Sequence, residues 1–181
     1  MSVVQNNTIS TNSITEATSA NGVTIDGVSL KDSFVTQSAL PFFRAYGTGD
    51  STTVTNGSRL PLNQTETNQG SYYSTSGYYF LTPVTGVYLI TLQYYSFNID
   101  GTTFRYTLYA SDNDSSFSNP SSLGRMRVDG TSSAKESDYM YSQCIKITTN
   151  KRVYWQNSQG SDATHYQATT EQTTFTGTLI G

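Results

Sequence analysis

Apolar and polar residues alternate along the larger, C-terminal part of this chain, with the two-residue period of half-buried β-strands. The clearest example is TGVYLITLQYYSFN, residues 85–98, in which every second residue from Tyr88 to Tyr94 is apolar. The alternate positions grade from apolar Val87 to polar Gln93. One apolar face and one mixed face are typical of a strand that buries a single side in a β-sandwich.

Turn-forming dipeptides separate the alternating runs and favour turns with positive φ. They are Asn56-Gly57, Ser76-Gly77, Asp100-Gly101 and Asp129-Gly130. TTFRYTLYAS, residues 102–111, follows one of them, so we expect it to pair with residues 85–98 as a long hairpin. Further strands are expected in MYSQCIKIT, KRVYWQNS and TTFTGTLIG, and no segment has a sustained helical period. Many short strands separated by turns predict an all-β sandwich or barrel.

Residues 1–38 have a different pattern and are predicted to form a separate N-terminal segment, before a head domain of residues 39–181. The apolar residues of this segment are few and widely spaced: Ile9, Ile14, Val23, Ile25, Val28 and Leu30. In one chain they bury too little apolar area to offset a backbone ordering cost of about 1–2 kcal/mol per residue. Three chains around one axis share a core, so these residues are predicted to form the interface of a trimeric β stalk. The alternative is a disordered tail.

Charge and composition exclude several classes of protein. Only 13% of the 181 residues are charged and the net charge is −3, so binding to nucleic acid is not expected. Arg125-Met126-Arg127 is the densest basic spot and is interpreted as a solvated strand face. No apolar run is long enough for membrane insertion. The start of the chain lacks the features of a secretory signal peptide, so we expect synthesis in a cytoplasm.

Few residues suggest chemistry, and no catalytic residue is predicted. His165 is the only histidine and is interpreted as a surface residue, because no nucleophile elbow or zinc motif accompanies it. Cys144 is the only cysteine, and its alternating surroundings predict a buried, inert thiol. Asp112 and Asp114 offer alternating oxygen ligands for calcium, the one possible cofactor. Asx turns explain the same two residues without a metal.

The head resembles a known family. GSYYSTSGYYFLTPVTGVYLITLQYYSF, residues 70–97, resembles the signature of complement component 1q globular heads. LPFFRAYG and TTFTGTLIG resemble the opening and closing strands of that family. The resemblance implies the ten-stranded jelly-roll β-sandwich shared with tumour necrosis factor, which forms a homotrimer around aromatic and aliphatic side chains. The residues that it places in the trimer interface or the sandwich core are Tyr73, Tyr78, Phe80, Tyr88, Ile90, Leu92, Phe175 and Leu179.

The N-terminal segment resembles proteins of a different kind. NTIST, followed by ITEATSANGVTIDGVSLKDS, is similar to short segments of structural and fibre proteins of tailed phages and large DNA viruses. Such segments often directly precede a C-terminal domain. The resemblance implies that the stalk attaches the head to a virion capsid or tail component.

These observations lead to one main hypothesis and several alternatives. We expect a trimeric viral fibre or head-decoration protein, displayed on the virion surface after synthesis in the host cytoplasm, whose head binds host-surface glycan or protein. Three weak sites on one trimer would act together through avidity. The alternatives are a purely structural capsid or cement protein without a receptor, and a glycan-degrading fibre enzyme. A cellular complement-type or cytokine-like ligand fits less well, because secretion and disulfide features are missing.

Overall fold

A computed structural model describes residues 40–48, 52–96, 103–129, 137–158, 163–165 and 173–181, and these contain strands but no helix. The predicted stalk and its boundary with the head lie outside the described residues. Within the described residues, no helix is long and apolar enough to cross a membrane. The strands are β1 (Phe42–Tyr46), β2 (Thr52–Val54), β3 (Gln64–Gln69), β4 (Tyr73–Ser74), β5 (Tyr79–Leu81), β6 (Gly86–Ser96), β7 (Thr103–Asp112), β8 (Ser121–Asp129), β9 (Ser137–Ile147), β10 (Lys151–Asn157), β11 (Ala163–His165) and β12 (Thr174–Leu179).

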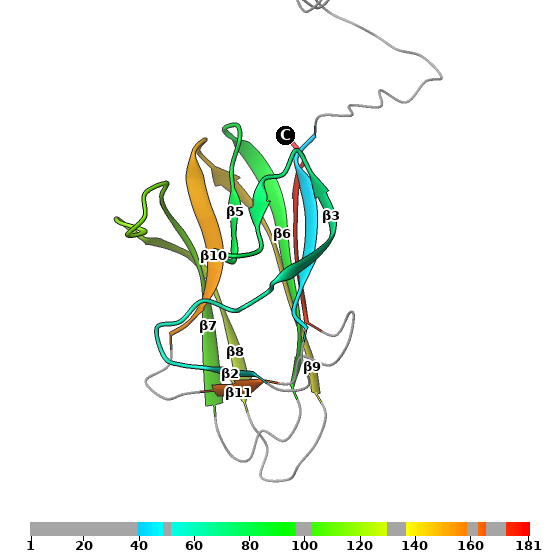
Figure 1. The fold of residues 1–181 in the computed structure, drawn as a ribbon, viewed down its shortest axis with the longest axis vertical. Coiled ribbons are helices and arrows are strands. Elements are labelled where there is room, and N and C mark those ends of the chain that lie inside the picture. Colours follow the sequence, from blue (N-terminus) through cyan, green and yellow to red (C-terminus); the bar gives the residue numbers. More distant parts are fainter. Residues whose placement is uncertain (1–39, 49–51, 97–102, 130–136, 159–162, 166–172) are drawn as a thin grey trace, which may run out of the picture. The chain divides into compact units, whose positions relative to one another are not determined.

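Ten of these strands form two antiparallel five-stranded sheets that face each other (Figure 1). The strand order is β3-β1-β12-β6-β9 in the first sheet and β4-β5-β10-β7-β8 in the second. We call them the AB sheet and the CD sheet, respectively. The first and last described strands, β1 and β12, pair with each other inside the AB sheet. The architecture confirms the predicted all-β sandwich with a jelly-roll order of strands.

The predicted long hairpin is wrong. Strand β6 pairs with β9 and β12 in the AB sheet, whereas β7 pairs with β8 and β10 in the CD sheet. The chain therefore crosses from one sheet to the other between β6 and β7. The alternating pattern could not distinguish these arrangements, because a strand of either sheet turns its apolar residues toward the same core.

The core lies between the sheets and is rich in aromatic side chains. Phe43 of β1 is fully buried, and its ring stacks on those of Phe80 and Tyr73 at centroid distances of 4.7 and 5.0 Å. Phe175 of β12 meets the Phe43 ring edge-on at 4.8 Å. A stacked and edge-to-face cluster of this kind adds stability beyond the area that it buries. Tyr73, Phe80, Tyr88, Ile90, Leu92 and Phe175 of the predicted set lie in this buried core, and Leu179 packs against it.

Cys144 does not have the predicted burial, because it lies exposed on the outer face of the AB sheet. In strand β9 the inward positions are those that pair with the buried residues of β6. Gln143 is one of them, since it pairs with Ile90, and Cys144 pairs with the outward Leu89. Tyr141 and Ile145 take inward positions as well, so the apolar residues beside Cys144 mark the face of the strand opposite to it.

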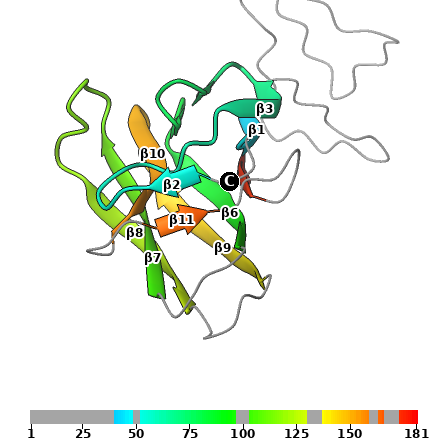
Figure 2. The ribbon, with the colours of Figure 1, turned by 60° about the horizontal axis from the view of Figure 1, so that its bottom comes forward.

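A short ribbon of β2 and β11 lies at one end of the sandwich (Figures 1 and 2). Its backbone pairs His165 with Thr52. Val54 of this ribbon is buried in the core, and its carbonyl accepts a hydrogen bond of 2.9 Å from the side chain of Asn157. The ribbon is thus fastened to the last residue of β10.

Candidate functional site

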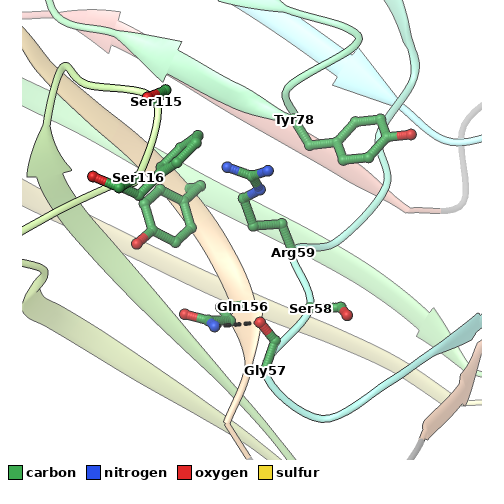
Figure 3. Close-up of a pocket in the computed structure, with 9 residues that line it drawn as sticks. Gly57, Ser58, Arg59, Tyr78, Ser115, Ser116 and Gln156 are labelled. Atoms are coloured by element: carbon green, nitrogen blue, oxygen red, sulfur yellow. Dashed lines mark hydrogen bonds between the residues drawn. The ribbon is translucent and has the colours of Figure 1, made fainter.

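A pocket of about 540 Å³ lies on the outer face of the CD sheet (Figure 3). Four separate parts of the chain form it: the turn before Leu60, the turn before β5, the loop between β7 and β8, and strand β10. Aromatic, hydroxyl, amide and guanidinium groups line it, and no carboxylate does. The lining residues are Gly57, Ser58, Arg59, Tyr78, Ser115, Ser116, Phe117, Tyr154 and Gln156.

The wall that carries Arg59 is an extension of the CD sheet. Arg59 forms an isolated antiparallel bridge with Gln156 of β10, and the Leu60 amide donates to the Trp155 carbonyl at 2.9 Å. Leu60 is buried in the core, so the side chain of Arg59 emerges on the opposite, outer face. Gly57 takes a φ of +81° in the preceding turn, which a glycine adopts without strain. The Gln156 side chain also donates to the Gly57 carbonyl (Figure 3).

The opposite wall is the loop between β7 and β8, which carries Phe117. Asp114 organises this loop, because its carboxylate accepts hydrogen bonds from the Ser116 hydroxyl at 3.1 Å and the Ser118 amide at 3.0 Å. Phe117 has a φ of +54°, a conformation that costs free energy for a bulky residue. Such strain persists only where the surroundings impose it, and it concentrates at functional sites.

The Phe117 ring is placed against a cluster of aromatic and cationic groups. It meets the Tyr154 ring edge-on at 5.2 Å and the Tyr79 ring at 5.5 Å. The guanidinium carbon of Arg59 lies 3.8 Å from its centroid, and that of Arg152 lies 4.6 Å away. Cation–π contacts of this kind contribute about 0.5–2 kcal/mol each. One phenyl ring thus holds two positive charges near each other.

The two arginines differ in the use of their donors. Arg152 is tied to the loop, since its Nε donates to the Asn113 side chain at 2.8 Å and a terminal nitrogen donates to the Asp114 carbonyl at 2.5 Å. No carboxylate in the described part of the chain forms an ion pair with Arg59. Desolvation lowers the pKa of Arg59, and the charge of Arg152 lowers it further. The pocket therefore contains a positive charge whose donors remain available to a ligand.

Tyr78 differs from the other residues that the sequence assigned to the trimer interface or the core. It is half-buried and borders the pocket rather than joining the core cluster (Figure 3). The expected turn at Ser76-Gly77 forms, but the positive φ falls on Tyr78 itself, at +58°. Tyr78 precedes β5 and does not take the core position that the resemblance allowed for it.

The calcium candidates Asp112 and Asp114 are occupied by protein partners. Asp112 forms an ion pair with Lys151 and accepts a hydrogen bond of 2.7 Å from Asn119. The Asp114 carboxylate accepts hydrogen bonds from the Ser116 hydroxyl and the Ser118 amide. Among the described residues, no group of three histidine, cysteine or acidic side chains is placed to hold a metal ion. The contacts in this loop are those of a polar turn.

The loop hydrogen bonds lead to an expected pH dependence. Donation from the Ser118 hydroxyl and amide, with a contribution from Ser116, lowers the pKa of Asp114 to about 2. Because the pKa is lowered on folding, the stabilisation is fully present above the unfolded value of about 3.9 and is lost as the pH falls through about 2. An NMR titration of the Asp114 carboxyl carbon should have its midpoint near pH 2. In the Ser118→Ala variant the midpoint should rise, and an unchanged midpoint would contradict the assigned contacts.

The comparisons with known proteins concern the whole head. No protein-family model matches the sequence, and no curated protein matches it significantly. Several solved structures do match. The tumour necrosis factor Eiger of S. frugiperda is 14% identical, with a TM-score of 0.65 over 79% of this chain and 94% of that chain. The globular domain of zebrafish complement 1qA is 14% identical, with a TM-score of 0.59 over 78% of this chain and 98% of that one.

A third solved structure, murine APRIL, is 11% identical to this chain. The match has a TM-score of 0.59 and covers 78% of this chain and 99% of that chain. At such identities a structural likeness shows the fold alone. The head of this chain therefore has the jelly-roll β-sandwich fold of complement component 1q and tumour necrosis factor.

Proposed function

We propose that this chain is a homotrimeric attachment protein of a virus particle and that its head binds glycans of the host surface in the pocket beside Arg59 and Phe117. The observation that supports this function is the composition of the pocket, in which aromatic rings, hydroxyl groups and an amide surround a guanidinium. Apolar surface combined with a few convergent polar groups is the usual design of a small-molecule site. Sugars present both kinds of surface.

Binding fits the pocket better than hydrolysis does. Glycoside hydrolysis ordinarily needs two carboxyl groups on opposite sides of the scissile bond. The nine lining residues include no aspartate, glutamate or histidine. The carboxylate of Asp114, next in sequence to the lining residue Ser115, is engaged by serine hydroxyl and amide groups of its own loop. We therefore favour an attachment protein over the glycan-degrading alternative.

The outer face of the AB sheet supports the proposed trimer. Leu89 and Thr91 of β6 are half-buried there, and Met140 of β9 is 76% exposed. The central part of this face carries no charge, because Ser142 and Cys144 of β9 follow Met140 along it. The ion pair of Arg44 with Glu66 lies toward the β1–β3 margin. An uncharged centre with a charged margin suits an interface between copies of the chain.

Attachment to the particle is assigned to the stalk, residues 1–38. The proposal rests on the resemblance of this segment to parts of phage and large-DNA-virus fibre proteins. Its partner would be a virion capsid or tail component, and the protein would reach the virion surface from the host cytoplasm. A purely structural cement protein would share the stalk and the trimer but would not need the pocket.

A glycan array probed with the labelled full-length chain tests the binding function. We expect retention on a subset of host-surface glycans, and Phe117→Ala should weaken it about tenfold or more because the aromatic wall is lost. Val84→Ala, at an exposed position that does not line the pocket, is the matched control and should leave binding unchanged. Retention that is insensitive to Phe117→Ala would exclude this pocket. Retention of no glycan, together with binding to particles, would favour the cement protein.

A further inference from the structure

Positive charge on this protein is concentrated on one face of the sandwich, although the whole chain is acidic with a net charge of −3. The register of the CD sheet places four residues in one row across its outer face. Arg59 faces Gln156 of β10, Gln156 faces Thr107 of β7, and Thr107 faces Arg125 of β8. Three strand spacings of about 4.8 Å separate the backbones at the two ends of the row, or roughly 14 Å.

A second pair of arginines extends the far end of this row. Arg105 of β7 and Arg127 of β8 are directly opposite each other, two residues along from Thr107 and Arg125. Both are exposed, as is Arg125. Exposed guanidinium groups on neighbouring strands present positive charge on this part of the face. Arg125 and Arg127 stand out in the sequence as its densest basic spot, but their alignment with Arg59 and Arg105 does not, because these come from other parts of the chain.

The near end of the row is the pocket itself. The Arg59 guanidinium is partly desolvated against Phe117 and lies near the second charge of Arg152. The described carboxylates closest in sequence to the pocket loop, Asp112 and Asp114, are engaged by Lys151 and by serine groups. An oxyanion at Arg59 would accept two parallel hydrogen bonds from the guanidinium fork and offset both charges.

Building on the proposed glycan-binding function, we propose that the ligand is an acidic oligosaccharide that places one anionic group on Arg59 and runs across the CD sheet toward Arg125, Arg105 and Arg127. The hydroxyl groups of Ser58, Ser115 and Ser116 contact the sugar in the pocket. Carboxylates of uronic or sialic acids and sulfate esters share the required chemistry. Thr107, in the middle of the row, is fully buried, so the contacts would come from the arginines at the two ends. Their backbone separation of roughly 14 Å favours an extended anionic chain over a single acidic sugar.

The test compares oligosaccharides that differ only in charge. Oligogalacturonate and its methyl ester have the same sugar chain, with and without carboxylates, and sulfated and unsulfated dextran oligomers form the second pair. Each is titrated calorimetrically into the full-length protein. We expect the charged members to bind and the neutral members to bind at least about tenfold more weakly. The preferred charged member identifies carboxylate or sulfate as the recognised group.

Single substitutions test the contribution of each end of the row to binding. Arg59→Gln should weaken binding of short and long acidic oligomers about 10- to 100-fold, as expected for a lost charge-assisted pair. Arg59→Lys should restore part of the loss, since lysine keeps the charge but not the fork. Arg125→Gln should weaken only the longer oligomers. Lys146→Gln, on the AB sheet, is the control for net charge and should change nothing. Unchanged thermal melting shows that each variant is folded.

Other results overturn the inference in distinguishable ways. Equal affinity for charged and neutral oligomers, with both lost in Phe117→Ala, would support the proposed glycan-binding function. It would refute the inference that the pocket recognises an acidic group. If Arg59→Gln leaves the affinity for acidic oligomers unchanged, the pocket is excluded as the subsite for the anionic group. Equal loss on short and long oligomers in Arg125→Gln would refute the row. Failure of every oligomer here and of every glycan on the array would reject both the inference and the proposed function.

Discussion

Replacing Phe43 with alanine is expected to reduce the free energy of unfolding of the head by about 3–5 kcal/mol, the usual cost of deleting a buried phenyl group. Phe43 is fully buried and connects the two sheets, because its ring stacks on Phe80 and Tyr73 and is met edge-on by Phe175. Removing the ring therefore opens a cavity at the junction of β1, β4, β5 and β12. Gly177, whose added Cβ would lie 2.4 Å from the Phe43 ring, shows how tightly the site is filled.

Urea unfolding at one fixed protein concentration measures this loss, since an oligomer's apparent stability depends on concentration. Val84→Ala is the control, because Val84 is 45% exposed and its replacement should change the free energy of unfolding by less than about 0.5 kcal/mol. A cost below about 1 kcal/mol for Phe43→Ala would mean that the aromatic cluster does not hold the sheets together.

Introducing a carboxylate at Leu89 is expected to convert the proposed head trimer into monomers. Leu89 lies at the uncharged centre of the outer AB face, between Thr178 of β12 and Cys144 of β9. In the proposed trimer Leu89→Asp would bury a charge in every subunit, and the effective penalty is several kcal/mol per buried ion. The inner face of β6 does not change, so each subunit should still fold.

Light scattering across a size-exclusion column provides the measurement, on the head alone, residues 39–181, and on the full-length chain. The unmodified head should have the mass of three copies, and Leu89→Asp should have the mass of one with an unaltered circular dichroism spectrum. Val84→Asp introduces the same charge away from this face and should remain trimeric. A trimer that survives Leu89→Asp in the head alone would place the interface elsewhere, and a monomeric unmodified head would assign trimerisation to the stalk.

The sequence predicted the strands of the head well, because alternation and turn dipeptides are local signals. Tyr88, Ile90 and Leu92 are buried as the two-residue period requires. Pairing was harder, since the period says which face is buried but not which strand lies alongside. The supposed hairpin of β6 and β7 failed for this reason. The prediction that Cys144 is buried failed for a related reason. Polar Gln143 takes an inward position in β9 and breaks the alternation of apolar and polar residues there.

The pocket could not be found from the sequence, because its residues come from four segments that only the fold brings together. Arg59 follows an ordinary turn dipeptide, and Tyr154 lies in an ordinary strand. One signal was present. Phe117 is the only large apolar residue in the polar loop SDNDSSFSNPSS, and a lone aromatic in such a loop indicates a contact beyond the loop itself. The same loop predicted local side-chain to backbone hydrogen bonds of aspartate, and Asp114 accepts one from the Ser118 amide.

The residues whose hydrogen bonds hold the β7–β8 loop in shape are largely different from the residues that line the pocket. Its base is held by Asp114, by Arg152 bound to Asn113, and by Asn119 bound to Asp112. Ser115 lies at the pocket and takes no part in these anchoring contacts. Substitutions at Ser115 can therefore alter what the pocket recognises while the loop keeps its shape. In the attachment protein that we propose, substitutions there could change the ligand without first losing a folded head.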